Sequence, residues 1–417
     1  MNTATSLSIH DNSSLSDIYV ARQPILDRKK NLYAYELLFR DSLKNMVPDV
    51  DGDRATSKVL LNSYLNIGLD ILSGGKTVFI NFTRNLIVQE LPSLFPRDTT
   101  IVEILEDVKP DPDVIKACTN LLKRGYVLAL DDFVFQPGME PLIELADIIK
   151  VDLRLIPIEQ VKNRLSLLEN RSPKLLAEKV ETHEEFRQAA DMGFQFFQGY
   201  FFHRPEIVQG KEITTSHISL LKTIMVINQP DYDLNKVEKL IRQDVGISYK
   251  LLRYINTAYF KRGKKVDNIK QALMLLGETE FRQFISLMVL SSAAPGKPNE
   301  LMRNSFIRAR FCELLGQESA CPEKAEAQFT VGLFSSLDAI FDQSMEAIVE
   351  KLPLSPDISE ALISKAGVLG KYLQLIEFYE VGEWKSVGKL AAELCIVEEK
   401  LPPIYLKACQ FASFLPA

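Results

Sequence analysis

Strand-like and helix-like segments alternate through the first half of the chain. Eight short runs are rich in apolar, β-branched or aromatic residues, which is typical of strands. These runs are 18–27, 31–41, 76–82, 99–106, 127–132, 146–153, 173–180 and 193–202. Helix-like segments separate most of them, and the one at 111–125 has Asp111 as its predicted N-cap, Pro112 in its first turn and Gly125 as its stop. Repeated βα units predict a TIM-type (β/α)8 barrel with its function in the loops after the strands.

A different pattern begins after Pro205. Amphipathic helices with short Gly or Pro breaks continue from Ser216 to the C-terminus, which predicts an all-α region. A chain of 417 residues is also too long for one ordinary core. We therefore expect an N-terminal tail at 1–17, a barrel at 18–205, a linker at 206–213 and a helical domain at 214–417.

Composition argues against several classes of protein. The net charge of −6 argues against broad binding to nucleic acid or to an anionic membrane. No apolar run approaches the ~20 residues of a membrane span, and the polar N-terminus has no apolar signal core. We therefore expect a cytoplasmic protein. Five cysteines without CxxC spacing indicate reduced core thiols rather than a disulfide or zinc framework. They are Cys118, Cys312, Cys321, Cys395 and Cys409.

Two adjacent carboxylates, Asp131 and Asp132, end the almost unbroken apolar run that begins at Val127. Neighbouring carboxylates repel each other unless a cation, a base or water holds them apart, so this pair suggests a divalent metal. The alternative is that Asp132 only caps the next helix.

Polar residues interrupt the other predicted strands at corresponding places. They are Glu36, Asn81, Glu103, Lys150 with Asp152, Glu178 with Glu181, and Gln198. A single one of these could be a satisfied polar group in a barrel core. Buried carboxylates are costly unless they are paired or bound to metal, so a set spread over seven strands favours oxygen ligands that converge on one site.

These motifs together resemble the EAL domain, the cyclic di-GMP phosphodiesterase barrel, over roughly 18–205. The matching pieces are QPI at 23–25, ELLFR at 36–40, NF at 81–82, EILE at 103–106, DDF at 131–133, KVD at 150–152, AEKVE at 177–181 and QGY at 198–200. The resemblance implies hydrolysis of cyclic di-GMP with two Mg²⁺ or Mn²⁺ ions and a possible homodimer through the barrel. Oxygen ligands suit these ions, and two such ions suit phosphodiester chemistry.

The resemblance also implies a role for each residue. Glu36, Asn81, Glu103 and Asp131 would hold one cation, and Asp132 with Asp131 a second. Lys150 would orient the attacking water, Glu178 would act as the base, and Asp132 would belong to the same catalytic group. Gln23, Arg40, Glu181 and Gln198 would bind the ligand, Arg40 by offering a planar fork to a phosphate.

Two departures from the family pattern bear on activity. The signature triplet is Glu36-Leu37-Leu38, and a leucine in place of alanine is expected to crowd a position that faces the ligand. The segment Val134–Met139 replaces a GTGYS-like loop that coordinates metal binding and dimerisation, although its anchor Glu106 is retained. Changes around a metal site can cost 10–100-fold in affinity or activity.

The second half resembles the HDOD domain, a relative of HD phosphohydrolases, over roughly 214–373. An HD hydrolase binds its metal through several histidines, and no histidine follows His217. Asp338, near the place where a His-Asp pair would stand, is expected to be a solvated helix residue. The basic cluster 261–265 reads as a solvated loop or a contact for an acidic partner. We therefore expect a module that binds a protein partner.

Two functions remain open at this point. The complete ligand set favours a cyclic di-GMP phosphodiesterase. The altered loop and the fused helical domain favour a non-catalytic adaptor that binds cyclic di-GMP or a protein. A nuclease is disfavoured because the acidic chain offers no long basic groove.

Overall fold

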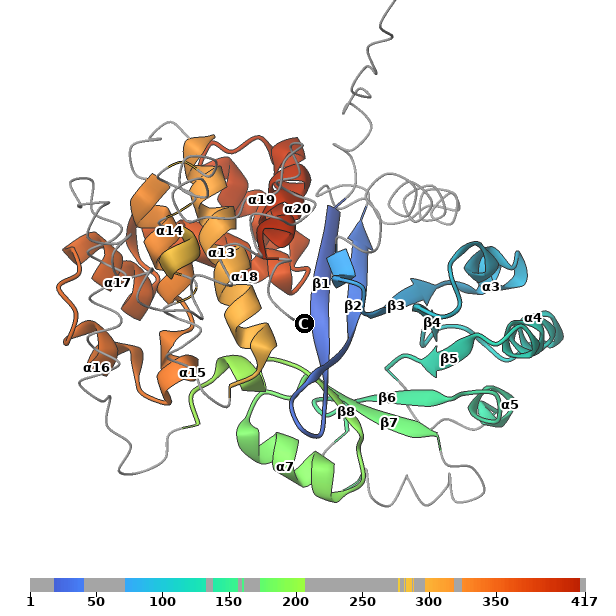
Figure 1. Cartoon of the computed structure of the whole chain (residues 1–417). Helices are drawn as coiled ribbons and strands as arrows, with labels where there is room; N and C mark the ends of the chain where they lie inside the picture. The colour runs from blue at the N-terminus through green and yellow to red at the C-terminus, as the bar shows by residue number, and fades with distance from the viewer. Residues whose placement is uncertain are drawn as a thin grey trace, which may run out of the picture.

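The computed structural model describes residues 19–40, 72–132, 138–156, 160, 173–206, 277, 281, 283–286, 288, 297–318 and 325–412. Within these residues a β-barrel formed by the first half of the chain stands beside a bundle of helices formed by the second half (Figure 1). Several predicted segments lie outside the described residues. They are the tail at 1–17, nearly all of the linker at 206–213, nearly all of a segment with helical periodicity at 54–72, the basic cluster at 261–265 and residues 134–137 of the altered loop.

Eight strands close the barrel in chain order, so the eight predicted strands and the barrel fold are confirmed. They are β1 Tyr19–Asp27, β2 Leu32–Arg40, β3 Thr77–Phe82, β4 Thr100–Ile104, β5 Val127–Leu130, β6 Ile148–Asp152, β7 Lys174–Glu178 and β8 Phe196–Gln198. The last strand is shorter than its sequence suggested because the backbone turns at Gly199. A Cβ at that position would lie 2.2 Å from the Val180 carbonyl oxygen, so only glycine fits. The 3₁₀ helix η5 Phe201–His203 follows.

The first strand departs from an all-parallel barrel. β1 runs antiparallel to both β2 and β8, whereas the other neighbouring strands are parallel. The turn between β1 and β2 explains the reversal. The Asp27 carboxylate accepts hydrogen bonds from the Lys29 and Asn31 N–H groups at 2.8 Å, and Lys30 adopts a left-handed φ of 62°. A hairpin therefore starts the barrel.

Helices cover the outside of the barrel (Figure 1). They include α3 Arg84–Val88, η3 Leu91–Leu94, α4 Pro112–Lys123, α5 Glu140–Ile143 and α7 His183–Asp191. The predicted boundaries of α4 are confirmed. Asp111 caps the N–H groups of Asp113 and Val114, Pro112 opens the helix, and Gly125 follows its end with a φ of 88°.

One layer of apolar side chains fills the barrel interior below its mouth. Each strand contributes one residue to this cluster: Ile25, Ala34, Phe79, Ile101, Ala129, Ile148, Leu176 and Phe196. Because successive side chains of a strand point to opposite faces, the next inward position on each strand lies two residues away, one level nearer the mouth. The layer therefore forms a dry floor under those positions.

The second half is all-α within the residues described, as predicted. Its helices are α13 Asn299–Gln317, α14 Ala325–Phe334, α15 Leu337–Phe341, α16 Met345–Val349, α17 Pro356–Ser364, α18 Gly367–Glu380, α19 Trp384–Glu393, η8 Glu398–Lys400 and α20 Leu401–Ala412. Helix α13 is buried along most of its length and packs against α14, α18 and α20. A search of the described residues finds no helix long and apolar enough to cross a membrane.

The helical half packs against the outer face of β1 and β2 (Figure 1). Apolar contacts are made where the Tyr19 and Trp384 rings meet at 5.8 Å. Polar contacts are buried beside them. Glu300 of α13 accepts a hydrogen bond from the Tyr35 hydroxyl at 2.7 Å and lies 3.6 Å from the Arg22 guanidinium. We call the group Arg22, Tyr35, Glu300 and Arg303 the interface network.

Two expectations about single residues were wrong. Asp338 is not a solvated helix residue. It is half-buried, its carboxylate accepts the Ala339 N–H, and burial raises its pKa to about 6. Cys395 is exposed rather than part of the core, because it lies in the turn after α19 with a left-handed φ of 54°. Cys118, Cys312 and Cys409 are free and buried, as expected.

Candidate metal and ligand site

A ring of polar side chains lies directly above the apolar floor of the barrel. Each strand supplies one member, two residues from its floor residue: Gln23, Glu36, Asn81, Glu103, Asp131, Lys150, Glu178 and Gln198. In β1 the ring residue precedes the floor residue, and in the other strands it follows, because β1 runs the opposite way. Strand alternation thus brings together residues predicted separately along 176 positions of sequence, from 23 to 198.

Lys150 lies at the centre of this ring with 0% of its surface exposed. Its Nζ is 2.7 Å from Glu178 Oε1, 2.8 Å from Asp131 Oδ1 and 3.4 Å from Glu36 Oε2, and it also contacts Glu103. Burial alone would lower the pKa of Lys150, but the four surrounding carboxylates raise it well above its ordinary value. The ammonium group therefore stays charged.

The carboxylates of the ring differ in how readily they hold a proton. Burial raises the pKa of Glu103 well above its usual range, and the neighbouring Glu36 and Asp131 add to that shift despite Lys150. Burial likewise raises the pKa of Glu178, with Asp131 and Glu36 contributing. For Asp131, Lys150 and a side-chain hydrogen bond with Glu103 outweigh burial and lower the pKa. The ring therefore combines an ionised aspartate with glutamates suited to accept protons.

Several oxygens of the ring and of the adjacent Asp132 have no hydrogen-bond partner among the described residues. These buried atoms are Asn81 Oδ1, Glu103 Oε2, Asp132 Oδ1, Glu178 Oε2 and Gln198 Oε1. Carboxylate oxygens of Asp131, Asp132 and Glu178 also lie within 4.8 Å of one another. Buried oxygens without partners are costly, and oxygen-only ligand sets suit hard divalent cations. The residues therefore fit Mg²⁺ or Mn²⁺.

Asp132 stands at the end of β5 with a left-handed φ of 36°. It does not cap α5, whose N-cap is Met139. Lys179, also left-handed with a φ of 54°, places its Nζ 3.7 Å from Asp132 and against Asp152. A strained non-glycine backbone after β5 and again after β7, the two strands that flank β6, is typical of a functional site.

Hydrogen bonds join the amides of the ring to Glu36. Gln198 Nε2 donates to Gln23 Oε1 at 2.7 Å and to Glu36 Oε2 at 2.6 Å. Asn81 Nδ2 donates to Glu36 Oε1 at 3.2 Å, which leaves Asn81 Oδ1 toward the site. Glu36 is thereby held by three donors on three strands, namely Asn81 of β3, Lys150 of β6 and Gln198 of β8.

A cavity of about 440 Å³ opens at the mouth of the barrel. Its barrel side includes ring residues together with Asp132, Arg154, Lys179, Glu181 and Tyr200. Glu181 is paired with Arg154 and, at 3.2 Å, with Arg204. These basic residues were missed because isolated Lys and Arg at strand ends look like solvated surface in the sequence.

The opposite wall of the cavity comes from the helical half. It is formed by Asn304 of α13, Glu380 and Val381 at the end of α18, and Tyr405 of α20. Sequence reasoning missed all four. No local pattern marks them, since they reach the site only through packing between regions more than 100 residues apart in the chain.

Three sequence expectations have other outcomes. Arg40 ends β2 and pairs with Tyr19, but its side chain lies outside the described part of the structure. Glu106 is exposed in the turn after β4, and residues 134–137 of the loop that it was expected to anchor lie outside the described residues. The expected crowding by Leu37 is wrong. Leu37 is buried in the core outside the barrel floor, because it alternates with the inward-facing Glu36, and Leu38 lines the cavity instead.

Comparison with protein families finds two matches. The EAL domain model matches residues 54–205, and the HDOD domain model matches residues 214–350. The order of the two matches follows the order of the barrel and the helical half.

Two curated proteins match most of the chain. A protein of Vibrio cholerae serotype O1 named cyclic di-GMP phosphodiesterase CdgJ is 40% identical over 381 residues, covering 90% of this chain and 88% of that protein. The protein YuxH of Bacillus subtilis is 35% identical over 402 residues, covering 94% and 98%. Among solved structures, a standalone EAL protein of Vibrio cholerae O395 bound to c-di-GMP is 24% identical, covers 44% of this chain and 90% of that one, and gives a TM-score of 0.36.

Proposed function

Because the chain belongs to the family of proteins that join an EAL domain to an HDOD domain, we propose that its barrel hydrolyses cyclic di-GMP to the linear dinucleotide pGpG. The observation that carries this proposal is the complete polar ring around Lys150, with four carboxylates within reach of one ammonium group. The name of the relative CdgJ as a cyclic di-GMP phosphodiesterase supports the choice of substrate.

The residues at the mouth would hold two Mg²⁺ or Mn²⁺ ions. Glu36, Asn81, Glu103 and Asp131 would bind one, and Asp131 with Asp132 the other. Bound cations would supply positive charge to the phosphodiester oxygens. The unpartnered oxygens of Asn81, Glu103 and Asp132 support this assignment, since each can accept a cation without giving up a hydrogen bond within the described structure.

Lys150 and Glu178 would handle the attacking water. The Lys150 ammonium can orient the water by donating to its oxygen, and the free Glu178 Oε2 can accept its proton. A glutamate whose pKa is raised by burial is a better base near neutral pH than an ordinary carboxylate. As water adds to phosphorus, its proton passes to Glu178, the bond from phosphorus to one ribose oxygen breaks, and that oxygen takes up a proton.

Ligand binding would fall to residues around the rim. Gln23, Gln198 and Glu181 line the cavity and offer amide and carboxylate groups, and Arg40 at the end of β2 would reach a phosphate. The helical domain at 214–417 would bind a protein partner, and the barrel could form a homodimer.

A second candidate is a non-catalytic adaptor that binds cyclic di-GMP without turnover. Two observations favour it. The segment Val134–Met139 departs from the GTGYS-like loop of the family. Helical residues also form one wall of the cavity, as suits a receptor whose ligand is sensed by a second domain.

A Mn²⁺ titration separates the two candidates. For the enzyme, hydrolysis of cyclic di-GMP should rise steeply with added Mn²⁺, since the altered loop should weaken metal retention without removing the ring. Calorimetry of cyclic di-GMP binding is run alongside. Binding without hydrolysis at saturating Mn²⁺ would reject the enzyme and leave the adaptor.

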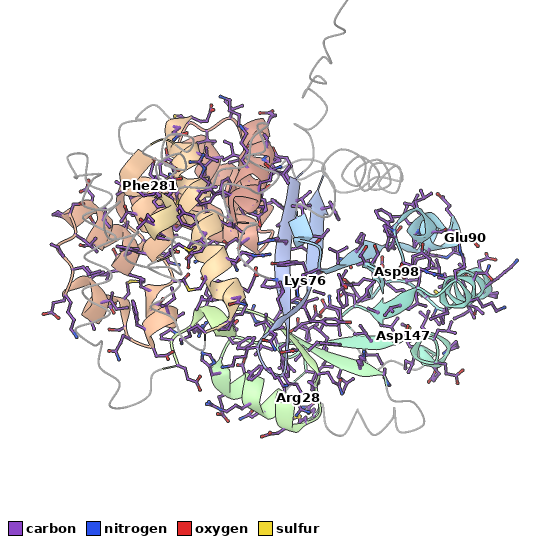
Figure 2. All side chains as sticks on the ribbon, viewed as in Figure 1. Arg28, Lys76, Glu90, Asp98, Asp147 and Phe281 are labelled. Atoms are coloured by element: carbon purple, nitrogen blue, oxygen red, sulfur yellow. The ribbon has the colours of Figure 1, made fainter. Side chains whose placement is uncertain are left out.

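Replacing residues 134–139 by a GTGYS-like sequence provides the matched gain-of-function test. Because Glu106 is present to anchor such a loop, we expect tighter Mn²⁺ binding and faster turnover. The parent chain carrying only Glu90→Ala is the control for effects that any substitution away from the site would have. Glu90 lies on the side of the barrel away from the helical half (Figure 2) and is absent from the cavity wall.

A further inference from the structure

The C-terminal end of α18 points its last carbonyl group at the barrel site. The Gly382 N–H bonds the Tyr379 carbonyl at 3.1 Å and the Glu383 N–H bonds the Phe378 carbonyl at 2.9 Å, with Gly382 left-handed at a φ of 72°. This Schellman arrangement ends the helix and leaves the Val381 carbonyl pointing outward. Gln23 of β1 takes it, donating from Nε2 at 3.3 Å.

That contact fixes which way the Gln23 amide faces. With Nε2 committed to Val381, Oε1 faces Gln198, whose Nε2 donates to it at 2.7 Å and to Glu36 at 2.6 Å. A hydrogen-bonded chain therefore runs from the backbone of the helical half through Gln23 and Gln198 to Glu36. We call this chain the amide relay.

Arg308 of α13 contacts residues beside two members of the amide relay, Val381 and Gln198. It is 1% exposed, and its guanidinium donates to Glu380 Oε2 at 2.6 Å, to Glu380 Oε1 at 3.0 Å and to the Tyr200 hydroxyl at 3.3 Å. Glu380 precedes Val381 at the end of α18, and Tyr200 follows Gln198 after the close turn at Gly199. One buried side chain thus links the end of α18, next to Val381, to the turn after β8, next to Gln198.

We propose that Arg308 is a positioning residue for the barrel site, which acts by clamping Tyr200 and Glu380 and so fixes the amide relay that orients Glu36. This inference rests on the proposed function, because it assigns Glu36 to cation binding. Groups that orient a metal ligand from behind affect metal affinity without touching the metal. Linkage also makes the effect reciprocal, so filling the site changes the free energy of the contact between barrel and helical half.

The test removes the clamp without leaving a buried charge. Replacing only Arg308 would strand Glu380, so the variant is Arg308→Met with Glu380→Leu, since exchanging a buried ion pair for apolar residues is often tolerated. The matched control is Arg310→Met with Glu313→Leu. Arg310 and Glu313 both lie on α13, pair at 2.6 Å and are absent from the cavity wall.

Mn²⁺ binding to the full chain, measured by calorimetry without substrate, is the main readout. We expect the Arg308→Met/Glu380→Leu variant to raise the Mn²⁺ Kd about 10-fold, the low end for residues that orient a metal ligand. The control should bind as the parent does. Tyr200→Phe removes only the hydroxyl that Arg308 reaches and should raise the Kd about 3-fold, as for one lost hydrogen bond. If the double variant does not fold, the Mn²⁺ affinity of Tyr200→Phe tests the positioning role of Arg308.

The single tryptophan of the chain gives a second readout. Trp384 lies at the interface, 5.8 Å from the Tyr19 ring of β1 and 5.1 Å from the Tyr379 ring of α18. Adding Mg²⁺ and cyclic di-GMP should change its fluorescence in the parent and in the Arg310→Met/Glu313→Leu control. The change should be reduced when the clamp is removed.

The outcomes distinguish this inference from the function on which it rests. A parent that binds neither Mn²⁺ nor cyclic di-GMP overturns both. A parent that binds, with unchanged affinity in both Arg308→Met/Glu380→Leu and Tyr200→Phe, overturns the positioning role alone. Equal weakening in the clamp variant and the control also overturns it, because the loss would then reflect general damage to α13.

Discussion

Two regions of this protein bury charge, and they do so in opposite ways. At the interface, Arg22 pairs with Glu300, and Arg308 pairs with Glu377 and Glu380. Arg303 donates to the Tyr35 hydroxyl that bonds Glu300, so three positive groups meet three negative ones. At the barrel mouth, the ion pairs among the described residues join Glu36, Glu103, Asp131, Asp132 and Glu178 to two cations, Lys150 and Lys179, so five negative groups meet two positive ones. Paired opposite charges join two parts of a protein, whereas an excess of negative charge favours the binding of a cation.

The difference separates structural from functional polar groups. A side chain at the interface should matter chiefly to folding free energy, and one at the barrel mouth chiefly to metal binding and turnover. Substitutions in the two regions should therefore differ in whether they lower stability or activity.

The largest effect is expected from Glu300→Ala at the interface. It removes the carboxylate that faces Arg22 at 3.6 Å and accepts from Tyr35 at 2.7 Å, leaving buried arginine charge uncompensated. The free energy of unfolding, measured in denaturant, should fall by about 3–5 kcal/mol. The matched change Arg22→Met with Glu300→Leu removes both charges and should cost less. Equal losses in the two variants would contradict a charge-based account.

Glu36→Ala at the barrel mouth should lower cyclic di-GMP hydrolysis by at least about 100-fold, or about 2.7 kcal/mol of transition-state stabilisation. Mn²⁺ binding should weaken with it. Stability should change little, because the substitution also relieves repulsion among the ring carboxylates. Hydrolysis at the parent rate by the folded variant would refute the assignment of Glu36 to the metal.

Tyr35→Phe tests the residue next to Glu36 on the other face of β2. The ring, stacked 4.3 Å from the Arg22 guanidinium, is retained, and the hydroxyl bonded to Glu300 is lost. Loss of a hydrogen bond to a charged group should cost about 2 kcal/mol of stability. Tyr126→Phe, which removes a buried hydroxyl bonded to the Phe95 carbonyl at 2.8 Å, should cost about 1 kcal/mol. The reverse order would contradict the interface assignment.

The smallest effect concerns pH and His203. Burial, with Arg308 nearby, lowers the pKa of His203 well below its usual value, and the ring pairs with Asn304 at 3.2 Å. The neutral ring thus contributes stability that is complete above the unfolded pKa of about 6.5 and is lost as pH falls below it. Between pH 6.5 and 5.5 the parent should lose about 1.0 kcal/mol more than His203→Gln. Parallel pH profiles of the two proteins would refute this.

Strand alternation made much of the barrel and its ring predictable. In each strand, apolar and polar residues two positions apart point to the same side, as Phe79 and Asn81 or Ile101 and Glu103 do. This local pattern shows which side chains face the barrel interior and which of them lies nearer the mouth. The direction of β1 was not encoded in the same way. Its apolar pattern reads equally well in either direction, and the reversal depends on the Asp27 turn.

Contacts between the halves were beyond local reasoning. Asn304, Glu380 and Tyr405 look like ordinary helix residues, and only packing across the interface brings them to the cavity. The expected exposure of Asp338 is wrong for the same reason, since a polar residue in the first turn of a helix is usually exposed. Patterns along the chain report the face of an element and do not identify the neighbour that covers it.

The hairpin that begins the barrel has a consequence for how such a chain can change over evolutionary time. In β1, Arg22 pairs with Glu300 of α13 while Gln23 belongs to the polar ring, and in β2, Tyr35 and Glu36 divide the same way. Deleting or inserting one residue between the turn and either pair would exchange their faces, sending interface groups into the cavity and cavity groups into the interface. Substitutions can be accepted one at a time in these strands, but a change of length disables both regions at once.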